Sequence, residues 1–239
     1  MRTSILLTVA AGLALGACGD SSAEPAGPVI NRDFKVAAFD KIEVAGPFEV
    51  TVTTGGQPSV RARGESNLIE KMEVTVEGGV LRIRPAKRSK LNWSFGSRDP
   101  ATVAVSVPML SQAAIAGSGG IAIDKISGAN FKGEIAGSGD LSLAAIDAGA
   151  VELAIAGSGD VTVAGKAKSV TYEIAGSGDI DAKGLVAETA RISIAGSGNV
   201  GANAWGSADV EMIGSGNVDL TGGAKCSVDK HGSGDVNCS

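Results

Sequence analysis

The sequence predicts an all-β protein built as a parallel β-helix or β-solenoid, in which coils of about 20 residues stack on one another. The main observation is a Gly-Ser-Gly phrase whose seven copies follow one another in steps of 20, 20, 19, 20, 18 and 18 residues, starting at Gly117, Gly137, Gly157, Gly176, Gly196, Gly214 and Gly232. A fixed period of this length is typical of repeat proteins whose units stack. Hydrophobic residues make up 44% of the chain despite its 35 glycines, so the glycines punctuate a packed structure.

The N-terminal residues have the features of a secretion signal. Arg2 precedes an apolar run from Ile5 to Leu15 that is too short to span a bilayer as a helix. The run ends in Leu15-Gly16-Ala17-Cys18, which resembles the lipobox of bacterial lipoproteins. That resemblance implies cleavage after residue 17 and a diacylglycerol on the thiol of Cys18. We therefore expect residues 1–17 to be a lipoprotein signal peptide.

A tether and a folded region are expected after the signal. Residues 18–32 are small, polar and proline-bearing, without a periodic apolar face, which predicts a flexible tether between lipid and fold. Gly19 after the cysteine favours sorting to the outer membrane of a Gram-negative bacterium. Residues 33–239 are expected to form the solenoid, with a divergent N-terminal part over 33–112 and regular repeats over 113–239.

The divergent part contains one worn copy of the repeat. Residues 42–52 align with residues 153–163, with Gly46 at the corner and Pro47-Phe48-Glu49 in place of Ser-Gly-Asp. Gly78-Gly79 between two alternating runs predicts a hairpin turn. Other segments predict four strands and one helical turn, over 60–63, 72–76, 80–84, 102–107 and 67–71. We expect this half to form an irregular β cap.

Each regular repeat predicts two short strands around a tight corner. In the copy around Gly157, Val151, Leu153 and Ile155 alternate with small or polar residues, and Val161 and Val163 alternate again after the corner. A less regular turn would close each unit. Near-identical corners favour in-register stacking over the alternative, an antiparallel meander in which each phrase is a hairpin tip.

A column of acidic and amide residues follows the corners. Asp140, Asp160, Asp179 and Asp235 occupy equivalent positions, and asparagine takes this position in two other copies. Asp and Asn suit turns because their side chains bond nearby backbone N–H groups. Calcium coordination by stacked carboxylates is the alternative. We expect a structural turn and predict no metal or other cofactor.

The last copy has the features of an end coil. Lys230 and His231 stand where earlier copies have Ile194 and Ala195, as expected of a coil that nothing covers. Cys226 and Cys238 fall at positions expected to point inward. A pair of cysteines in an oxidising compartment predicts a disulfide.

A basic segment interrupts the divergent part. Residues 82–98 contain six basic residues and no acidic one, including Arg84, Lys87, Arg88 and Lys90, with Trp93 nearby. As a ligand site it would contact lipid headgroups, lipopolysaccharide or acidic envelope glycan. The alternative is a solvated loop whose aromatic residues cover the solenoid end.

The chain resembles a known bacterial family. The residues that carry the resemblance are Phe39-Asp40-Lys41-Ile42-Glu43-Val44, then Gly79-Val80-Leu81-Arg82-Ile83, then the serial Ala-Gly-Ser-Gly-Asp units. Together they resemble the head GIN domain family, which is named after autotransporter adhesins. The resemblance implies a right-handed β-helix-like fold on a secreted or lipid-anchored protein, and suggests adhesion.

Composition restricts the function classes. A formal charge of −5 gives no electrostatic support for nucleic-acid binding. His231 is the single histidine, and its place in the end coil favours a polar cap over a catalytic base. The sequence therefore predicts a non-enzymatic, adhesin-like envelope lipoprotein. The alternatives are a secreted polysaccharide-active enzyme, which could use Asp179 with Asp181 or Asn217 with Asp219, and a calcium-stabilised binding module.

Overall fold

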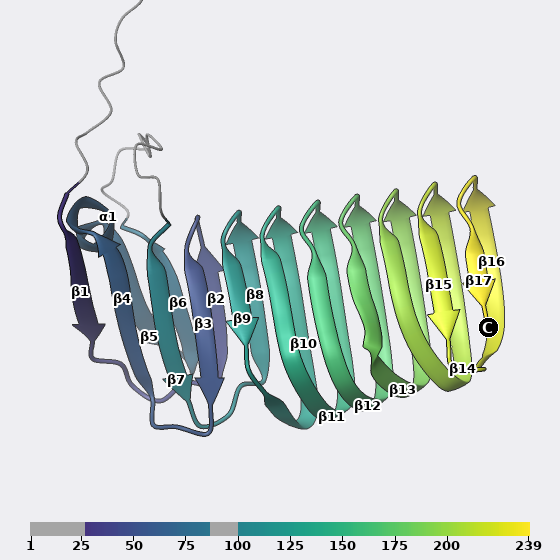
Figure 1. Cartoon of the computed structure of the whole chain (residues 1–239), viewed down its shortest axis with the longest axis horizontal. Coiled ribbons are helices and arrows are strands. Elements are labelled where there is room, and N and C mark those ends of the chain that lie inside the picture. The colour runs from purple at the N-terminus through teal and green to yellow at the C-terminus, as the bar shows by residue number, and fades with distance from the viewer. Residues whose placement is uncertain (1–26, 87–99) are drawn as a thin grey trace, which may run out of the picture.

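The computed structural model describes residues 27–86 and 100–239, which form a β-solenoid. Figure 1 shows the coils side by side along one long axis, with the irregular strands at the N-terminal end and the last coil at the other. The predicted fold class is confirmed. Within the described residues, helical structure is limited to one short segment, α1 (Ser66–Glu70).

The regular part begins at residue 112 and its strands stack in parallel. Each Gly-Ser-Gly phrase lies directly over the next one, because Gly117 pairs with Gly137, Gly137 with Gly157, and so on to Gly214 and Gly232. The antiparallel meander is therefore wrong for this part. The strands are β8 (Gln112–Gly117), β9 (Gly120–Ile123), β10 (Ile126–Gly137), β11 (Asp140–Gly157), β12 (Val161–Gly176), β13 (Ile180–Gly196), β14 (Asn199–Gly214), β15 (Asn217–Thr221), β16 (Lys225–Gly232) and β17 (Val236–Cys238).

The coils of β11 and β13 bury three runs of side chains where the sequence suggested two strands. In β11 the runs are Leu141 with Leu143, Ile146 with Ala148, and Val151 with Leu153 and Ile155. Two exposed alanines separate the first run from the second, and the pairing register with β12 shifts there. The expected second turn is therefore a bend within a continuous strand, because the backbone keeps its hydrogen bonds to the neighbouring coil while the alternation slips by one residue.

The interior is one continuous apolar core. Its central column stacks five isoleucines from successive coils, all at most 2% exposed: Ile115, Ile135, Ile155, Ile174 and Ile194. Burial of each side chain stabilises the fold by about 1.5–3 kcal/mol before entropy is counted. The column continues through Met212 and ends at Lys230.

The predicted worn copy is a true coil. Strands β2 (Lys41–Ala45) and β3 (Glu49–Thr54) pair in parallel with β8 and β9, with Val44 opposite Ile115 and Glu49 opposite Gly120. Gly46 has φ of 108°, in the same positive range as the glycines that open the regular corners. Its N–H donates to the carbonyl of Ala116 at 2.9 Å. The corner therefore keeps its backbone shape although Ser-Gly-Asp is replaced.

The first coils are not stacked in chain order. β6 (Val80–Pro85) and β7 (Thr102–Val107) pair in parallel with the outer edges of β2 and β3. The coil of β2 and β3 thus lies between the layer of β6 and β7 and the layer of β8 and β9 (Figure 1). After β3 the chain first forms β6 and β7 on one side of the β2–β3 coil, and then β8 and β9 on the other side.

Antiparallel strands close the N-terminal end. β5 (Met72–Glu77) forms the predicted hairpin with β6 through Gly78-Gly79, whose φ angles are 60° and 79°. β4 (Ser59–Glu65) pairs antiparallel with β7, and β1 (Val29–Phe34) pairs antiparallel with β4. The predicted tether over 18–32 is therefore too long by four residues. The sequence hid β1 because its six residues are largely exposed and give no apolar alternation.

Candidate functional site

The Gly-Ser-Gly corners carry a backbone role. The N–H of Ser158 donates to the carbonyl of Gly137 at 2.8 Å, and the same bond recurs at five other regular corners, from Ser138, Ser177, Ser197, Ser215 and Ser233. Gly157 has φ of 140°, and a Cβ atom there would collide with the Gly137 carbonyl oxygen. A Cβ atom on Gly159 would collide with the Gly139 carbonyl oxygen. Both glycines are therefore needed for coils to stack this closely.

The Asp and Asn column forms a hydrogen-bond ladder between coils. The Oδ1 atom of Asp140 accepts from the N–H of Asp160 at 3.2 Å, and Asp160 accepts likewise from Asp179 at 3.0 Å. The ladder continues from Asp179 through Asn199 and Asn217 to the N–H of Asp235. The side chains thus satisfy backbone donors of the next coil, whereas the sequence suggested bonds within one turn.

This ladder bears on the calcium alternative. Among residues 27–86 and 100–239, no group of three or more His, Cys, Asp or Glu side chains is placed to hold a metal ion. Asn199 and Asn217 replace carboxylates and also donate through Nδ2 to the Oδ1 atom below, at 2.8 and 2.9 Å. The observed bonds therefore fit a structural column.

A groove with a volume of about 750 Å³ runs over the outer surface of the strands that lead into the corners, here called the pre-corner face. Its floor is a column of alanines at the position just before each corner glycine: Ala45, Ala116, Ala136, Ala156, Ala175 and Ala195. Six in-register coils at about 4.8 Å spacing give this floor a length of about 24 Å. Only methyl groups cover the backbone there, so a ligand can approach closely.

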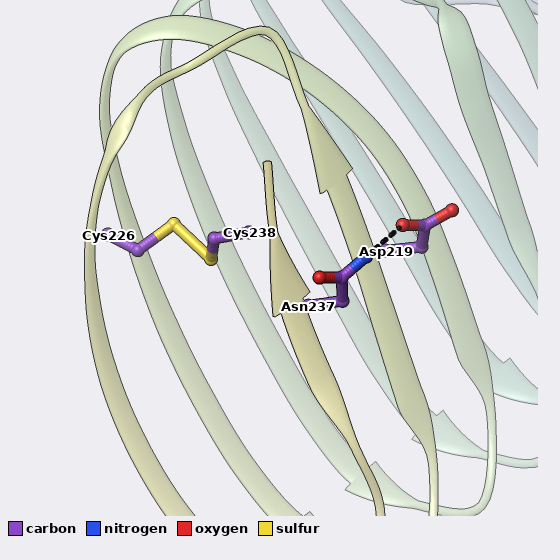
Figure 2. Close-up of a disulfide and its surroundings, with 4 residues drawn as sticks. All are labelled: Asp219, Cys226, Asn237 and Cys238. Carbon is purple, nitrogen blue, oxygen red and sulfur yellow. Dashed lines mark hydrogen bonds between the residues drawn. A yellow bond between two sulfur atoms is a disulfide. The ribbon is translucent and has the colours of Figure 1, made fainter.

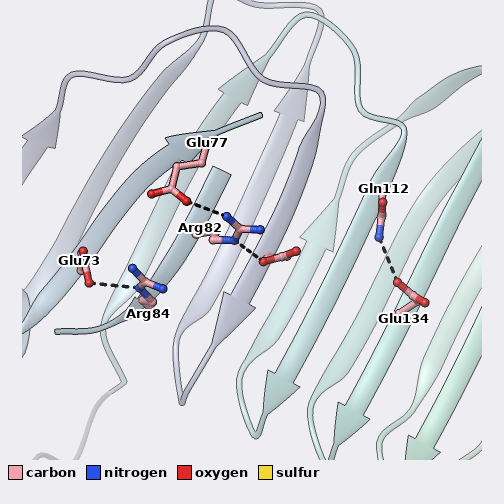
Figure 3. A network of polar contacts seen from close by, with 7 residues as sticks. Glu73, Glu77, Arg82, Arg84, Gln112 and Glu134 are labelled. Atoms are coloured by element: carbon pink, nitrogen blue, oxygen red, sulfur yellow. Dashed lines mark hydrogen bonds and ion pairs between the residues drawn. The ribbon is translucent and has the colours of Figure 1, made fainter. Parts of the chain in front are cut away.

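Polar side chains line one side of the groove. Three glutamates occupy the outward position two residues before an alanine of the floor: Glu43, Glu134 and Glu173. Gln112 occupies the outward position four residues before Ala116. Gln112 donates through Nε2 to Glu134 at 3.0 Å (Figure 3). Lys132 approaches Glu134 at 3.1 Å. Lys132 also contacts Glu152 at 2.9 Å, and these two partners, Glu152 first, raise the pKa of the lysine.

A second polar network borders the groove at its N-terminal end. Arg82 donates to Glu43 at 2.7 Å and to Glu77 at 3.0 Å, which raises the pKa of the guanidinium. Arg84 donates to Glu73 at 3.1 Å (Figure 3). Ile83 pairs with Val44, so the next residue, Arg84, lies beside Ala45. In this layer Arg84 therefore occupies the position that alanine holds in the coils of the groove.

The opposite end of the alanine column is also bounded by a large side chain. Ile213 pairs with Ala195 and is 54% exposed, in the position that alanine holds in the preceding coils. The groove is therefore a trough of finite length with an apolar floor and an acidic side.

The predicted basic patch is only partly within the described residues. Arg84 is there, and its pairing with Glu73 offsets its charge. The other members, Lys87, Arg88, Lys90 and Trp93, lie outside the described residues, as does the predicted lipidation site Cys18.

The predicted cysteine pair is joined at the end coil. Cys226 and Cys238 form a disulfide, with Cα atoms 6.6 Å apart and a sequence separation of 12 (Figure 2). They pair with the buried residues Ala208 and Leu220 of the preceding coil, so they continue interior columns as predicted. Cys238 is nevertheless exposed, because no further coil covers it. Lys230 closes the same end by donating to the Gly234 carbonyl at 2.7 Å.

The carboxylates considered for glycan cleavage are engaged in structural contacts. Lys183 crosses the coil of Gly201 and bonds Asp219 at 2.7 Å, and Asn237 donates to the other oxygen at 3.2 Å (Figure 2). The hydrogen bond from Lys183 and then that from Asn237 lower the pKa of Asp219. Asp179 belongs to the corner ladder. This arrangement keeps Asp219 ionised, which suits an ion pair and not a proton donor.

Sequence reasoning missed the groove. Its signal was present, since alanine precedes the corner glycine in six copies including the worn one. In one repeat taken alone, a small residue at an outward position is typical of plain solenoid surface. Recognising a trough required the coil order at the N-terminal end and the bulky residues that bound the column.

Comparisons with known proteins agree with this architecture. Residues 38–224 match the family model "Putative auto-transporter adhesin, head GIN domain". A structure described as a "putative adhesin", from Bacteroides fragilis, is 24% identical, with a TM-score of 0.81 over 90% of this chain and 99% of that one. A "putative lipid binding protein" from Parabacteroides distasonis is 26% identical, with a TM-score of 0.70 over 89% and 97%. A second Parabacteroides distasonis structure, again a "putative adhesin", is 21% identical, with a TM-score of 0.67 over 89% and 98%.

Two further observations accompany these matches. No curated protein matches the chain. Within the described residues, no helix has the length and apolar character needed to cross a membrane. The worn opening coil, the serial Ala-Gly-Ser-Gly units and the family match over most of the chain lead to one conclusion: the protein belongs to the head GIN domain family.

Proposed function

We propose that this protein is a non-enzymatic binding module of the bacterial cell envelope, adhesin-like in role, that holds an elongated envelope component in the groove of its pre-corner face. The observation that carries the proposal is the trough itself, about 750 Å³ in volume and floored by alanines from six coils. A site repeated along the solenoid axis suits a linear ligand better than a compact one.

The relatives support an interaction role. The family description names a "putative auto-transporter adhesin", and the 26% identical relative from Parabacteroides distasonis is described as a "putative lipid binding protein". The non-enzymatic assignment is supported by the state of the carboxylates, because Asp219 is paired with Lys183 and Asp179 serves the corner ladder. Both side chains have structural tasks that a catalytic role would disturb.

The proposed location is the outer membrane of a Gram-negative cell, with a lipid on Cys18. The described chain starts at the capped, N-terminal end of the solenoid. An anchor at Cys18 would therefore direct that end toward the membrane and place the disulfide-closed coil farthest from it. The groove would then run away from the membrane, open to other envelope components.

The anchor is tested by replacing the lipidated thiol. Cells that express the full-length chain or its Cys18→Ser variant are labelled with a radioactive fatty acid and fractionated. The original chain should carry label and sediment with outer membranes, while Cys18→Ser should carry none and be recovered in the soluble fraction. Label on the variant, or its continued sedimentation with membranes, would overturn the anchor.

The groove is tested with two matched substitutions in the unlipidated Cys18→Ser chain. Ala156→Phe places a ring on the groove floor, while Ala122→Phe places the same ring on an exposed strand position after the corner. Sedimentation with envelope fragments from cells lacking the protein measures binding. We expect Ala156→Phe to lose at least tenfold in affinity and Ala122→Phe to match the parent. Equal binding by both variants, or no sedimentation of the parent chain, would refute a binding role for the groove.

A further inference from the structure

The acidic side of the groove has a period of its own. At the outward position three residues before the corner glycine, Glu43, Glu134, Glu173 and Glu211 occupy every second coil. Ala114, Ala154 and Ser193 fill the coils between them. Neighbouring strands are about 4.8 Å apart, so these carboxylates recur about every 9.6 Å along the solenoid axis, the first three of them beside the alanine floor.

The charge of this row is left partly uncompensated. Glu43 is paired with Arg82, and Glu134 contacts Lys132 and Gln112. Within the described residues, the carboxylates of Glu173 and Glu211 have no ion pair or side-chain hydrogen bond, and no Lys, Arg or His lines the groove. The next outward column behaves differently, because Lys132 there bridges to Glu152 of the adjoining coil. Glu173, beside the alanine floor, and Glu211, one coil beyond its last alanine, therefore face solvent without a cation.

We propose that the groove binds a basic polypeptide segment in the polyproline II conformation, with Lys or Arg at every third residue. This inference rests on the proposed function of the groove and names the chemistry of its ligand. The cationic side chains would pair with the glutamate row, and the segment's apolar face would lie on the alanines.

Geometry selects this conformation among those a polypeptide can adopt. A polyproline II helix repeats every three residues at about 3.1 Å each, so one face recurs every 9.3 Å or so. Over the three steps of the glutamate row the mismatch is only about 1 Å. Two turns of α-helix measure about 10.8 Å, which accumulates a mismatch of roughly 3.6 Å.

An extended β-strand fits less well for a different reason. A β-strand ligand gains affinity by pairing with a free sheet edge, but the groove crosses strands whose backbone groups are already paired with the coils on both sides. A polyproline II segment needs no such partners. The glutamate row, about 29 Å long over its three steps, spans about nine residues of such a segment, and the alanine floor, about 24 Å long, accommodates about eight of them.

The test uses synthetic peptides and the unlipidated full-length chain. Fluorescence anisotropy compares a labelled (Lys-Pro-Pro)4 peptide with a (Lys-Pro)4 peptide, which has the same number of lysines at a two-residue spacing, and with (Glu-Pro-Pro)4. We expect (Lys-Pro-Pro)4 to bind at least fivefold more tightly than (Lys-Pro)4, with affinity that falls as salt is added. The acidic peptide should not bind.

Variants locate the peptide on the glutamate row. The double variant Glu173→Gln/Glu211→Gln should bind (Lys-Pro-Pro)4 about threefold to tenfold more weakly, as expected for two exposed ion pairs. Glu188→Gln, which removes an exposed carboxylate outside the groove, should bind as the parent does. Equal affinity for the two spacings, or an unchanged double variant, would overturn the inference.

The outcome separates this inference from the proposed function. If no peptide binds but sedimentation with envelope fragments still depends on Ala156, the polypeptide ligand is wrong and the groove keeps its role, with a glycan as the next ligand to test. If Ala156→Phe leaves sedimentation unchanged, the groove itself is not the site, and both proposals fall.

Discussion

Replacement of a single corner glycine should disrupt the solenoid locally and measurably. Gly157→Ala adds one methyl group at a residue with φ of 140°, a conformation that side-chain-bearing residues rarely adopt. Backbone strain of this kind costs about 1–3 kcal/mol. The new Cβ atom also meets the Gly137 carbonyl oxygen, which already accepts the N–H of Ser158 at 2.8 Å.

Relief of that contact requires the two coils to separate at the corner. Separation weakens the Ser158 bond, worth about 1 kcal/mol, so the summed destabilisation is about 2–4 kcal/mol. Because each coil contacts only its neighbours, the loss should concentrate in the coils on either side of Gly157. The measurements are urea unfolding by circular dichroism and amide hydrogen exchange resolved by residue.

Two matched substitutions divide the effect into strain and collision. Gly159→Ala meets the Gly139 carbonyl oxygen without a positive φ, so it tests the collision alone. Gly128→Ala lies on β10 with no atom within 4 Å of the added carbon, and there a stabilisation of about 0.4–1 kcal/mol is expected from a stiffer unfolded chain. If Gly157→Ala unfolds at the same urea concentration as Gly128→Ala, the account of the corners given above is wrong.

Three other predictions concern the core, the end coil and the polar surface. Tyr172 is fully buried, its hydroxyl has no hydrogen-bond partner among the described residues, and burial raises its pKa. Tyr172→Phe should therefore raise the free energy of unfolding by about 1–2 kcal/mol, and a less stable variant in urea titration would show that the hydroxyl is satisfied. Cys226→Ser/Cys238→Ser should cost about 3 kcal/mol by the loop-entropy argument, seen as faster hydrogen exchange confined to β16 and β17, whereas unchanged exchange would mean that the bridge adds nothing. The pKa of Asp219, measured by NMR, should lie below its ordinary value of 3.8 because Lys183 and Asn237 bond its charged form. A lowered folded-state pKa means that the Lys183–Asp219 pair stabilises the protein at pH values above the ordinary carboxyl range, and that this stabilisation is lost as the pH falls through the folded-state pKa. Lys183→Met should move the titration midpoint of Asp219 back up.

Much of the architecture followed from local chemistry that a sequence displays. The spacing of the Gly-Ser-Gly phrases predicted stacked coils because identical corners are required only when they lie over one another. Alternation around Leu153 and Val161 identified interior positions, and Gly46 marked the worn coil. The pairing of Cys226 with Cys238 followed from their equivalent inward positions.

Other features depend on contacts between residues far apart in the chain. The layer of β6 and β7 beneath β2 and β3 is set by which strand edges remain free, which no local pattern records. The third buried run of β11 and β13 arises where alternation slips at a bend, and β1 is held by its partner β4 and not by apolar residues.

The repeat by itself determined that this protein is a stack of β coils with glycine corners, because close stacking leaves no room for a side chain at those positions. Only the tertiary structure decided what the outer surface does. Stacking turned single alanines into the floor of a trough and single glutamates into a row with a two-coil period. A column across coils exists only after neighbouring coils are in register, so its shape and charge cannot be read from one repeat.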